Sequence, residues 1–177
     1  FLALTLCCGC SQQGRLLGAP APDLENAVGI DVEFNHLHSS RYQSPLTDEW
    51  RNGDDLEQLL IGAIDAAEQS VQMAVQELTL PRVAVALIRA QRRGVRVQIV
   101  LENTYSTPWS EQHSSHLPIR EKRRHQQLQL LADRDGNGIT TREEASHGDA
   151  VAILRRAQLP LVDDTDDGSR GSGLMHH

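Results

Sequence analysis

The sequence VQMAVQELTLPRVAVALIRAQRRGVRVQIVL, residues 71–101, decides the fold class. Near each end of this stretch, apolar residues recur at every second position, which is the pattern of a strand with one buried face. They are Val71, Met73, Val75, Val95, Val97, Ile99 and Leu101. Between them, Pro81 suits the first turn of a helix, where its missing N–H needs no partner, and Gly94 suits the end.

A strand, a helix and a strand within about 30 residues have the length of a right-handed parallel crossover. The fold class is therefore α/β, with a parallel-rich sheet and flanking helices. A further helix precedes residues 71–101, because six apolar residues are spaced one or three apart on one helical stripe. They are Leu56, Leu59, Leu60, Ala63, Ile64 and Ala67. Asp54 and Glu57 have the spacing of a capping box at its start.

Alternation of apolar and acidic residues predicts a strand at residues 30–34. A helix is expected after Pro118, with Leu128 and Leu131 on it. A later helix contains Val151, Ile153 and Leu154 and leads into a strand at residues 159–162. The acidic run at residues 163–168 is expected to be an exposed turn.

Residues 1–10 resemble the second half of a bacterial lipoprotein signal peptide, in which Cys10 would be lipidated. Cys8 is a second candidate, and an ordinary secretory signal is a third interpretation. Residues 11–28 mix Gly, Pro, Ala and polar side chains, which is typical of a linker. The expected location is the cell envelope, with a lipid anchor in the bacterial membrane.

The formal net charge is −7, which argues against general nucleic-acid binding, because phosphate tracking needs a basic stripe. The cluster at residues 120–124 is expected to be a solvated helix face. Aromatic residues make up 3% of the chain, too few for stacking platforms. After the leader, no apolar run approaches the roughly 20 residues needed to cross a bilayer.

Residues 133–144, DRDGNGITTREE, resemble an EF-hand calcium loop. Calcium needs six to eight hard oxygen ligands from a loop wrapped around it, with a sharp turn at a Gly in position six. The resemblance implies six ligands: Asp133, Asp135, Asn137, the Ile139 carbonyl, Thr141, through water or directly, and Glu144. Since the loop is single, its expected role is structural.

One departure leaves alternatives open in this loop. The apolar residue that EF-hand loops hold at position eight is here Ile139, at position seven. In a tightened loop, Glu143 rather than Glu144 would be the bidentate ligand. Without calcium, the same residues would form a plain turn, followed by a helix capped by Thr140 or Thr141 with Glu143 or Glu144 three residues on.

Polar residues follow two of the predicted strands. Glu77 and residues 102–107 lie at their carboxyl ends, where ligands bind in open α/β sheets. They are candidates to line a site, and ordinary polar loops are an equal alternative. His36 and His38 are two apart in a loop, but no cysteine or carboxylate cluster of matching spacing supports a metal site there.

The last seven residues, GSGLMHH at 171–177, have the pattern of a small-residue loop turning into a strand that delivers a histidine. The alternative is a linker with the start of a purification tag. Together with the helix end AAEQS at residues 66–70 and RRGVRV at residues 92–97, this stretch resembles the first half of a phospholipase D superfamily domain.

The resemblance implies a domain at residues 29–177, incomplete, with an insertion at residues 110–147 that contains the calcium-like loop. Superfamily members carry a His-x-Lys-x4-Asp motif. His176 would be its histidine and His177 its variable position, so the lysine and aspartate would follow His177. We therefore expect the chain as given to be inactive by itself.

The implied activity is phospholipase D-type phosphodiester hydrolysis through a phosphohistidine, with His176 as nucleophile and a phospholipid as substrate. A nuclease and a phosphatidyl transferase are variants of the same chemistry. No cofactor is expected for catalysis, so calcium at residues 133–144 would support structure or membrane association. The competing hypothesis is a calcium-binding cell-envelope module that catalyses nothing. The oligomeric state is left open.

Overall fold

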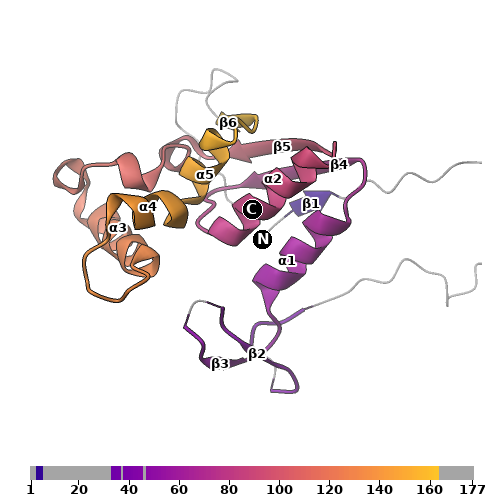
Figure 1. Cartoon of the computed structure of the whole chain (residues 1–177), viewed down its shortest axis with the longest axis horizontal. Helices are drawn as coiled ribbons and strands as arrows, with labels where there is room; N and C mark the ends of the chain where they lie inside the picture. Colours follow the sequence, from indigo (N-terminus) through magenta and orange to yellow (C-terminus); the bar gives the residue numbers. More distant parts are fainter. Residues whose placement is uncertain (1–2, 6–32, 37, 46, 164–177) are drawn as a thin grey trace, which may run out of the picture. The chain divides into compact units, whose positions relative to one another are not determined.

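Figure 1 shows the chain as a computed structural model. It describes residues 3–5, 33–36, 38–45 and 47–163. These residues form two compact units. The larger contains residues 3–5 and 57–163, and the smaller contains the described residues from 33 to 56. The predicted linker, Cys8, Cys10 and the terminal stretch with His176 lie outside the described residues.

The larger unit contains a four-stranded sheet in the order β1-β4-β5-β6. Its strands are β1 (Ala3–Thr5), β4 (Ser70–Val75), β5 (Arg96–Leu101) and β6 (Leu161–Asp163). β5 pairs in parallel with both β4 and β6, whereas β1 is antiparallel to β4. The α/β fold class and the parallel crossover are therefore confirmed. β1 falls in the segment interpreted as a signal peptide, and that interpretation stays a prediction.

One face of β4 and β5 is buried, as the period of two predicted. Val71, Met73, Ile99 and Leu101 are all at most 2% exposed. The other face is more polar, and on it the Gln72 side chain donates a hydrogen bond to Gln98 at 3.1 Å. The apolar face of the sheet therefore supplies one half of the core.

Three helices supply the other half: α1 (Leu56–Ala66), α2 (Pro81–Arg92) and α5 (Ala150–Arg156). α2 runs across the sheet in Figure 1 and buries five apolar residues. They are Val83, Ala84, Ala86, Leu87 and Ala90. The helix starts at Pro81 and is followed by Gly94 at φ +89°, as predicted, because only glycine adopts that conformation without strain.

The predicted apolar stripe of α1 is wrong in part. Leu56 and Leu59 are 43% and 44% exposed, and the buried residues of the helix are Ile61 and Ile64. The core therefore meets a face rotated from the predicted stripe, because Ile61, which the spacing pattern left out, belongs to the core cluster.

The predicted capping box of α1 is also wrong. The helix begins at Leu56, so the residue preceding it is Asp55 rather than Asp54. The Asp54 carboxylate accepts a hydrogen bond from the Phe34 N–H at 2.9 Å, which holds the pKa of that carboxyl below its usual range. The Glu57 carboxylate instead forms an ion pair with Arg82 at 3.1 Å.

Between β5 and α5, the chain forms three short 3-10 helices and two α-helices. They are η2 (Asn103–Tyr105), η3 (Trp109–Glu111), η4 (Ser114–His116), α3 (Ile119–Ala132) and α4 (Arg142–Gly148). This region, at the left of Figure 1, has a small apolar core of its own made of Trp109, Leu128 and Ala132, with Ala145 against it. The helix predicted after Pro118 is confirmed, but Leu131 is 61% exposed and lies outside this core.

The smaller unit contains an antiparallel hairpin of β2 (Arg41–Gln43) and β3 (Trp50–Asn52), which the sequence analysis did not predict. The strand predicted at residues 30–34 is wrong at its described end, because Glu33 and Phe34 belong to no strand and the chain turns immediately after them. Gly53 explains how the loop after β3 can approach the turn at Asn35. A Cβ at Gly53 would lie 2.2 Å from the Asn35 carbonyl carbon, so the two loops approach closely only with glycine there.

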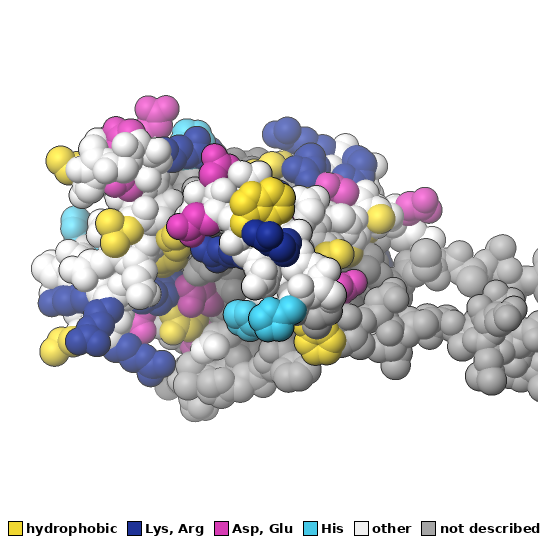
Figure 2. Space-filling model, turned by 90° about the horizontal axis from the view of Figure 1, so that it is seen from below, with side chains coloured by type: hydrophobic (Ala, Val, Ile, Leu, Met, Phe, Trp, Pro, Cys, Tyr) yellow, Lys and Arg dark blue, Asp and Glu magenta, His cyan; other side chains and the backbone are white. Residues whose placement is uncertain are grey.

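On the face shown in Figure 2, Lys and Arg side chains are spread among acidic ones rather than gathered in one stripe. None of the helices in the described part of the chain combines the length and the apolar composition that crossing a membrane requires.

Candidate functional site

The carboxyl ends of β4 and β5 lie side by side, because the two strands pair in parallel from Ser70 with Arg96 to Val75 with Leu101. Glu77 follows β4 and Glu102 follows β5. The main chains join here, since the Glu102 N–H donates to the Gln76 carbonyl at 3.3 Å. This edge of the sheet is the place where the sequence predicted a site.

Arg124 of α3 connects the loops that follow the two strands. Its Nε donates a hydrogen bond to Glu77 Oε1 at 2.7 Å, and its guanidinium carbon lies 4.7 Å from the ring centroid of Tyr105. The structure therefore brings Glu77 and Tyr105 together, as predicted for residues lining one site. The cation between them was not predicted.

The expectation that residues 120–124 form a solvated helix face is wrong for Arg124. Its side chain is 23% exposed, because Arg124 borders the face of α3 that carries the buried His125 and Leu128. Glu121, one turn earlier, lies 3.8 Å from the same guanidinium. A helical wheel centred on Leu128 would have placed Arg124 beside the buried face.

Tyr105 is kept uncharged by this environment. Burial raises the pKa of its phenol, and the negative charges of Glu121 and Glu77 raise it further. The phenol therefore remains a hydrogen-bond donor at neutral pH and is not a nucleophile. With Arg124 balanced by two carboxylates, this part of the edge provides positioning and charge rather than a reactive group.

Glu102 has a structural role in the described part of the edge. It is 3% exposed, and its two carboxylate oxygens accept hydrogen bonds from the backbone N–H and the hydroxyl of Thr104, at 3.0 and 2.9 Å. The carboxylate thus caps η2. Of the predicted lining residues, Glu102 closes the turn, whereas Glu77 and Tyr105 face the ion-pair cluster.

The calcium-like loop lies at the other end of α3. Gly136 and Gly138 have φ of +67° and +79°, so the loop turns sharply at both glycines. The Asp133 carboxylate accepts the Gly138 N–H at 2.7 Å, and Asp135 accepts the Asn137 N–H at 3.1 Å. These bonds fold the acidic side chains toward the inside of the loop.

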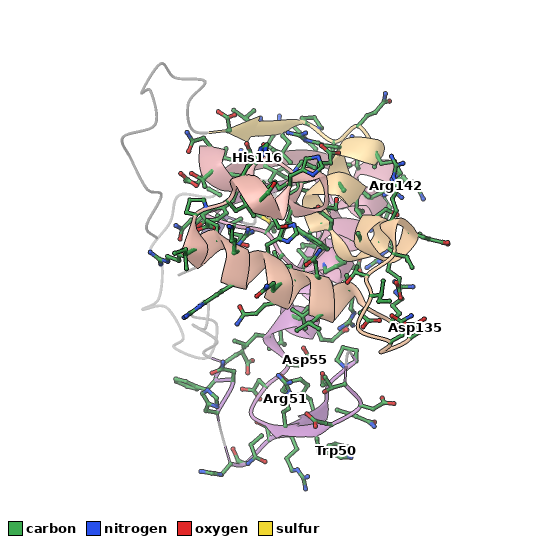
Figure 3. All side chains as sticks on the ribbon, turned by 90° about the vertical axis from the view of Figure 1, so that its left-hand side faces the viewer. Trp50, Arg51, Asp55, His116, Asp135 and Arg142 are labelled. Atoms are coloured by element: carbon green, nitrogen blue, oxygen red, sulfur yellow. The ribbon has the colours of Figure 1, made fainter. Side chains whose placement is uncertain are left out.

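Three predicted calcium ligands, Asp133, Asp135 and Glu144, come together in this loop. One carboxylate oxygen from each lies within 4.8 Å of the others, and no other group of this kind occurs among the residues described. Asp135 is labelled in Figure 3, at the outer end of the loop below α4. Within the described residues, His36 and His38 belong to no such group.

Glu144, rather than Glu143, is the acid that the loop uses. Its Oε2 accepts the N–H of Thr141 at 2.9 Å, and the Thr141 hydroxyl accepts the Glu144 N–H at 3.2 Å, which is a reciprocal capping box at the start of α4. A third bond comes from the Arg134 N–H at 2.9 Å. These donors hold the pKa of Glu144 at about 2.

Of the remaining predicted ligands, Asn137 and Thr141 form hydrogen bonds within the loop, and Ile139 has an exposed side chain. Asn137 Oδ1 accepts the Ile139 N–H at 2.7 Å, the Thr141 hydroxyl donates to Glu144 at 2.8 Å, and the Ile139 side chain is 70% exposed. Asp133 Oδ1 is shielded from solvent and has no hydrogen-bond partner among the residues that the structure describes. Because a buried carboxylate oxygen needs a partner, the donor set fits a hard cation.

His176, the predicted nucleophile, and most of the acidic run that starts at Asp163 lie outside the described residues. The described part of the site therefore consists of the strand ends with their Arg124 cluster and the acidic loop.

Comparison with known families identifies residues 60–153 with the family described as cardiolipin synthase, PLD-like domain. The matched segment begins in α1 and ends in α5, so it spans the parallel crossover and the region that holds the acidic loop. No curated protein and no solved structure gives a significant match.

Proposed function

The chain belongs to the phospholipase D-like family, and from that premise we propose that it is part of a phosphodiesterase that acts on phospholipids. Hydrolysis or transfer at phosphodiesters is the general chemistry of this superfamily. The family match over residues 60–153 is the observation that carries the proposal.

The proposed nucleophile is His176, from its place in the pattern GSGLMHH. A neutral imidazole nitrogen attacks phosphorus, the bond from phosphorus to the leaving alkoxide breaks, and a second histidine of the superfamily pattern gives that alkoxide a proton. Water then attacks the phosphohistidine and gives its proton to the second histidine, the bond from phosphorus to the imidazole nitrogen breaks, and the phosphate product leaves with both histidines restored. An alcohol in place of water gives transfer instead of hydrolysis.

The carboxyl edge of the sheet supports the proposed phosphodiesterase function, because it offers a place for the substrate. Ligands of open α/β sheets bind beyond the carboxyl ends of the strands, and β4, β5 and β6 end at the same edge because they are parallel. Arg124 fixes the loops after β4 and β5 there through Glu77 and Tyr105. We propose that this cluster positions the wall of the substrate site.

The sequence that follows His177 gives the simplest test. The motif requires Lys at the next position and Asp five residues after that Lys. The lysine ammonium would offset the charge that develops on the phosphoryl oxygens. Any other residue at the first of these positions would contradict the assignment of His176 as nucleophile.

The substrate class is tested by supplying the full-length protein with three phosphodiesters: zwitterionic phosphatidylcholine vesicles, a single-stranded DNA oligonucleotide and bis(p-nitrophenyl) phosphate. We expect cleavage of the lipid and of the chromogenic ester and little cleavage of DNA, because the net charge of −7 disfavours a polyanion. Preferential cleavage of DNA would indicate a nuclease instead of a phospholipid phosphodiesterase. Formation of a new phospholipid from an added alcohol would indicate a transferase.

A second function, calcium binding at residues 133–144, is favoured by the unpartnered Asp133 Oδ1 among three converging carboxylates. We propose that Asp133, Asp135, Asn137, Thr141 and Glu144, with the Ile139 carbonyl, hold one calcium ion. Its role would be to fix the α3–α4 connection. In the competing hypothesis of a non-catalytic cell-envelope module, calcium binding would be found without phosphodiester cleavage.

Isothermal titration with calcium tests this second function. Asp133→Ala and Glu144→Gln should abolish the heat of binding, whereas Glu143→Gln should leave it almost unchanged, because Glu143 lies outside the carboxylate group. Equal losses in Glu143→Gln and Glu144→Gln would contradict the ligand assignment. An absence of calcium heat in the unsubstituted protein would contradict calcium binding itself.

A further inference from the structure

A cavity of about 970 Å³ lies between η3, α3, α4 and α5. It is at the upper end of the size range of small-molecule sites, which is about 300–1,000 Å³. Its walls come from four separate segments, so a ligand there would contact both the α3–α4 region and α5. Nothing in the family's chemistry described above uses this cavity.

Three arginines and one carboxylate line the cavity. Arg142, labelled in Figure 3, is one of the lining residues and has no hydrogen-bond or ion-pair partner within the described ranges. Arg155 and Arg156 each give one N–H to a carbonyl, of Ser106 and Ser146. Most of their donors remain available.

The carboxylate, Glu111, compensates these charges only weakly. Its nearest oxygen is 4.0 Å from Arg155, and the two side chains are 62% and 48% exposed. Exposed pairs of this kind interact weakly because water screens them. The cavity therefore has an excess of guanidinium donors, and an anion is the chemical class that matches it.

His125 and Trp109, which also line the cavity, are largely buried. His125 is 4% exposed, and its Nε2–H donates a hydrogen bond to the Trp109 carbonyl at 3.1 Å.

We propose that this cavity binds a small organic phosphate. The guanidinium groups of Arg142, Arg155 and Arg156 bind the phosphate oxygens, because their planar forks match phosphate in a bidentate way. The charge of three cations is better matched by a phosphate ligand, with its charge of −1 to −2, than by a ligand that carries a single carboxylate. The organic part lies toward Trp109 and the alanines at positions 145 and 152.

The test is direct binding measured by the fluorescence of Trp109. The chain has two tryptophans, so Trp50→Phe leaves Trp109 as the single reporter. In EDTA, which removes any calcium contribution, the full chain is titrated with inorganic phosphate, glycerol 3-phosphate and, as a control, acetate. We expect saturable changes with the first two ligands, tighter binding of glycerol 3-phosphate, and none with acetate.

Arg142→Gln should weaken the binding of glycerol 3-phosphate by about tenfold or more, because it removes a charged donor pair, whereas Arg142→Lys should weaken it less. Arg123→Gln, the same change on the exposed face of α3, is the matched control and should have no effect. Since Arg142 has no partner in the described part of the chain, its substitution is not expected to shift the thermal midpoint, and this is measured in parallel.

A fourth titration, with dihexanoyl phosphatidic acid, distinguishes the source of the phosphate. Tighter binding than glycerol 3-phosphate identifies a lipid headgroup, and equal or weaker binding identifies a free metabolite. The proposal is overturned if no phosphate saturates the signal, or if Arg142→Gln and Arg123→Gln change the affinity equally. Because binding is measured without turnover, the outcome is independent of the proposed phosphodiesterase function.

Discussion

Glu144 is the residue at which the sequence allowed two interpretations, a bidentate calcium ligand and the acid of a capping box. The structure forms the capping box with Thr141 and also places a Glu144 oxygen beside those of Asp133 and Asp135. The two roles would use the same carboxylate, because the N-terminus of α4 and the end of the loop coincide. Sequence spacing predicted both roles, and it also left Glu143 as an alternative; the capping role of Glu144 is the one that the structure shows.

The capping role predicts an acid sensitivity. The pKa of Glu144 falls from the usual 4.5 to about 2 in the folded chain, mainly through the hydrogen bonds from Thr141. A carboxyl whose pKa is lower in the folded state than in the unfolded state stabilises the fold at pH values above the unfolded-state pKa. This stabilisation is lost as the pH falls toward the folded-state pKa. In EDTA at pH 6, the wild type should therefore have a higher thermal midpoint than the Glu144→Gln variant. The two midpoints should converge between pH 4.5 and 2.

A constant difference in midpoint across this pH range would show that the ionised Glu144 does not stabilise the cap. Glu143→Gln is the control, because it should show no such convergence.

A second prediction at this scale concerns Gly148, the last residue of α4. A Cβ there would lie 2.5 Å from the Ala132 Cβ, so two helices of the small core would have to move apart. Gly148→Ala should lower the free energy of unfolding by about 1–3 kcal/mol, the usual cost of overpacking. Urea denaturation followed by circular dichroism measures it.

Gly62 of α1 is the matched control, since a Cβ there meets nothing within 4 Å. Gly62→Ala should raise the stability by about 0.5–1 kcal/mol through helix propensity. Destabilisation of equal size by both alanines would mean that the contact with Ala132 is not the cause.

At the scale of elements, local pattern predicted the β4–α2–β5 unit well, because each element carries its own signal. The alternation of the strands, Pro81 and Gly94 all appear within the segment itself. The stripe of α1 was predicted less well, because a spacing pattern does not say which of two adjacent stripes meets the core. Ile61, not Leu59, is the residue that packs there.

Short elements were missed for a related reason. The β2–β3 hairpin has strands of three residues, all but Tyr42 exposed, so no apolar alternation marks it. The strand β6 begins at Leu161 rather than Leu159, because Gln158 takes a positive φ of 56° and turns the chain after α5. Backbone turns at residues other than glycine carry little sequence signal.

The connection between α3 and the sheet predicts a measurable coupling. Arg124 and Glu77 are each about three-quarters buried, so their pair should contribute more than an exposed one. A double-mutant cycle with Arg124→Gln and Glu77→Gln should give a coupling of about 1 kcal/mol in the free energy of unfolding.

The pair of Arg89 and Asp65 is the comparison, with side chains 44% and 37% exposed and an expected coupling below about 0.5 kcal/mol. An Arg124–Glu77 coupling no larger than that of Arg89–Asp65 would mean that the cluster does not hold α3 to the sheet.

For the whole molecule, the sequence predicted the fold class and the family, but only part of the site. Glu77 and Tyr105 were expected at the carboxyl edge from their positions after strands. Arg124 was not expected, because it is 47 residues from Glu77 and the contact depends on how α3 packs. The same holds for the arginines of the cavity, which come together only in three dimensions.

The central claim is that the chain contributes the nucleophile of a phosphodiesterase. The most direct measurement compares bis(p-nitrophenyl) phosphate hydrolysis by the full-length protein, His176→Ala and His177→Ala. His177 is the matched neighbour, since it would occupy the variable position of the proposed motif. We predict that kcat falls by about a thousandfold or more in His176→Ala and changes only a few-fold in His177→Ala. Equal rates for the wild type and His176→Ala would contradict the account.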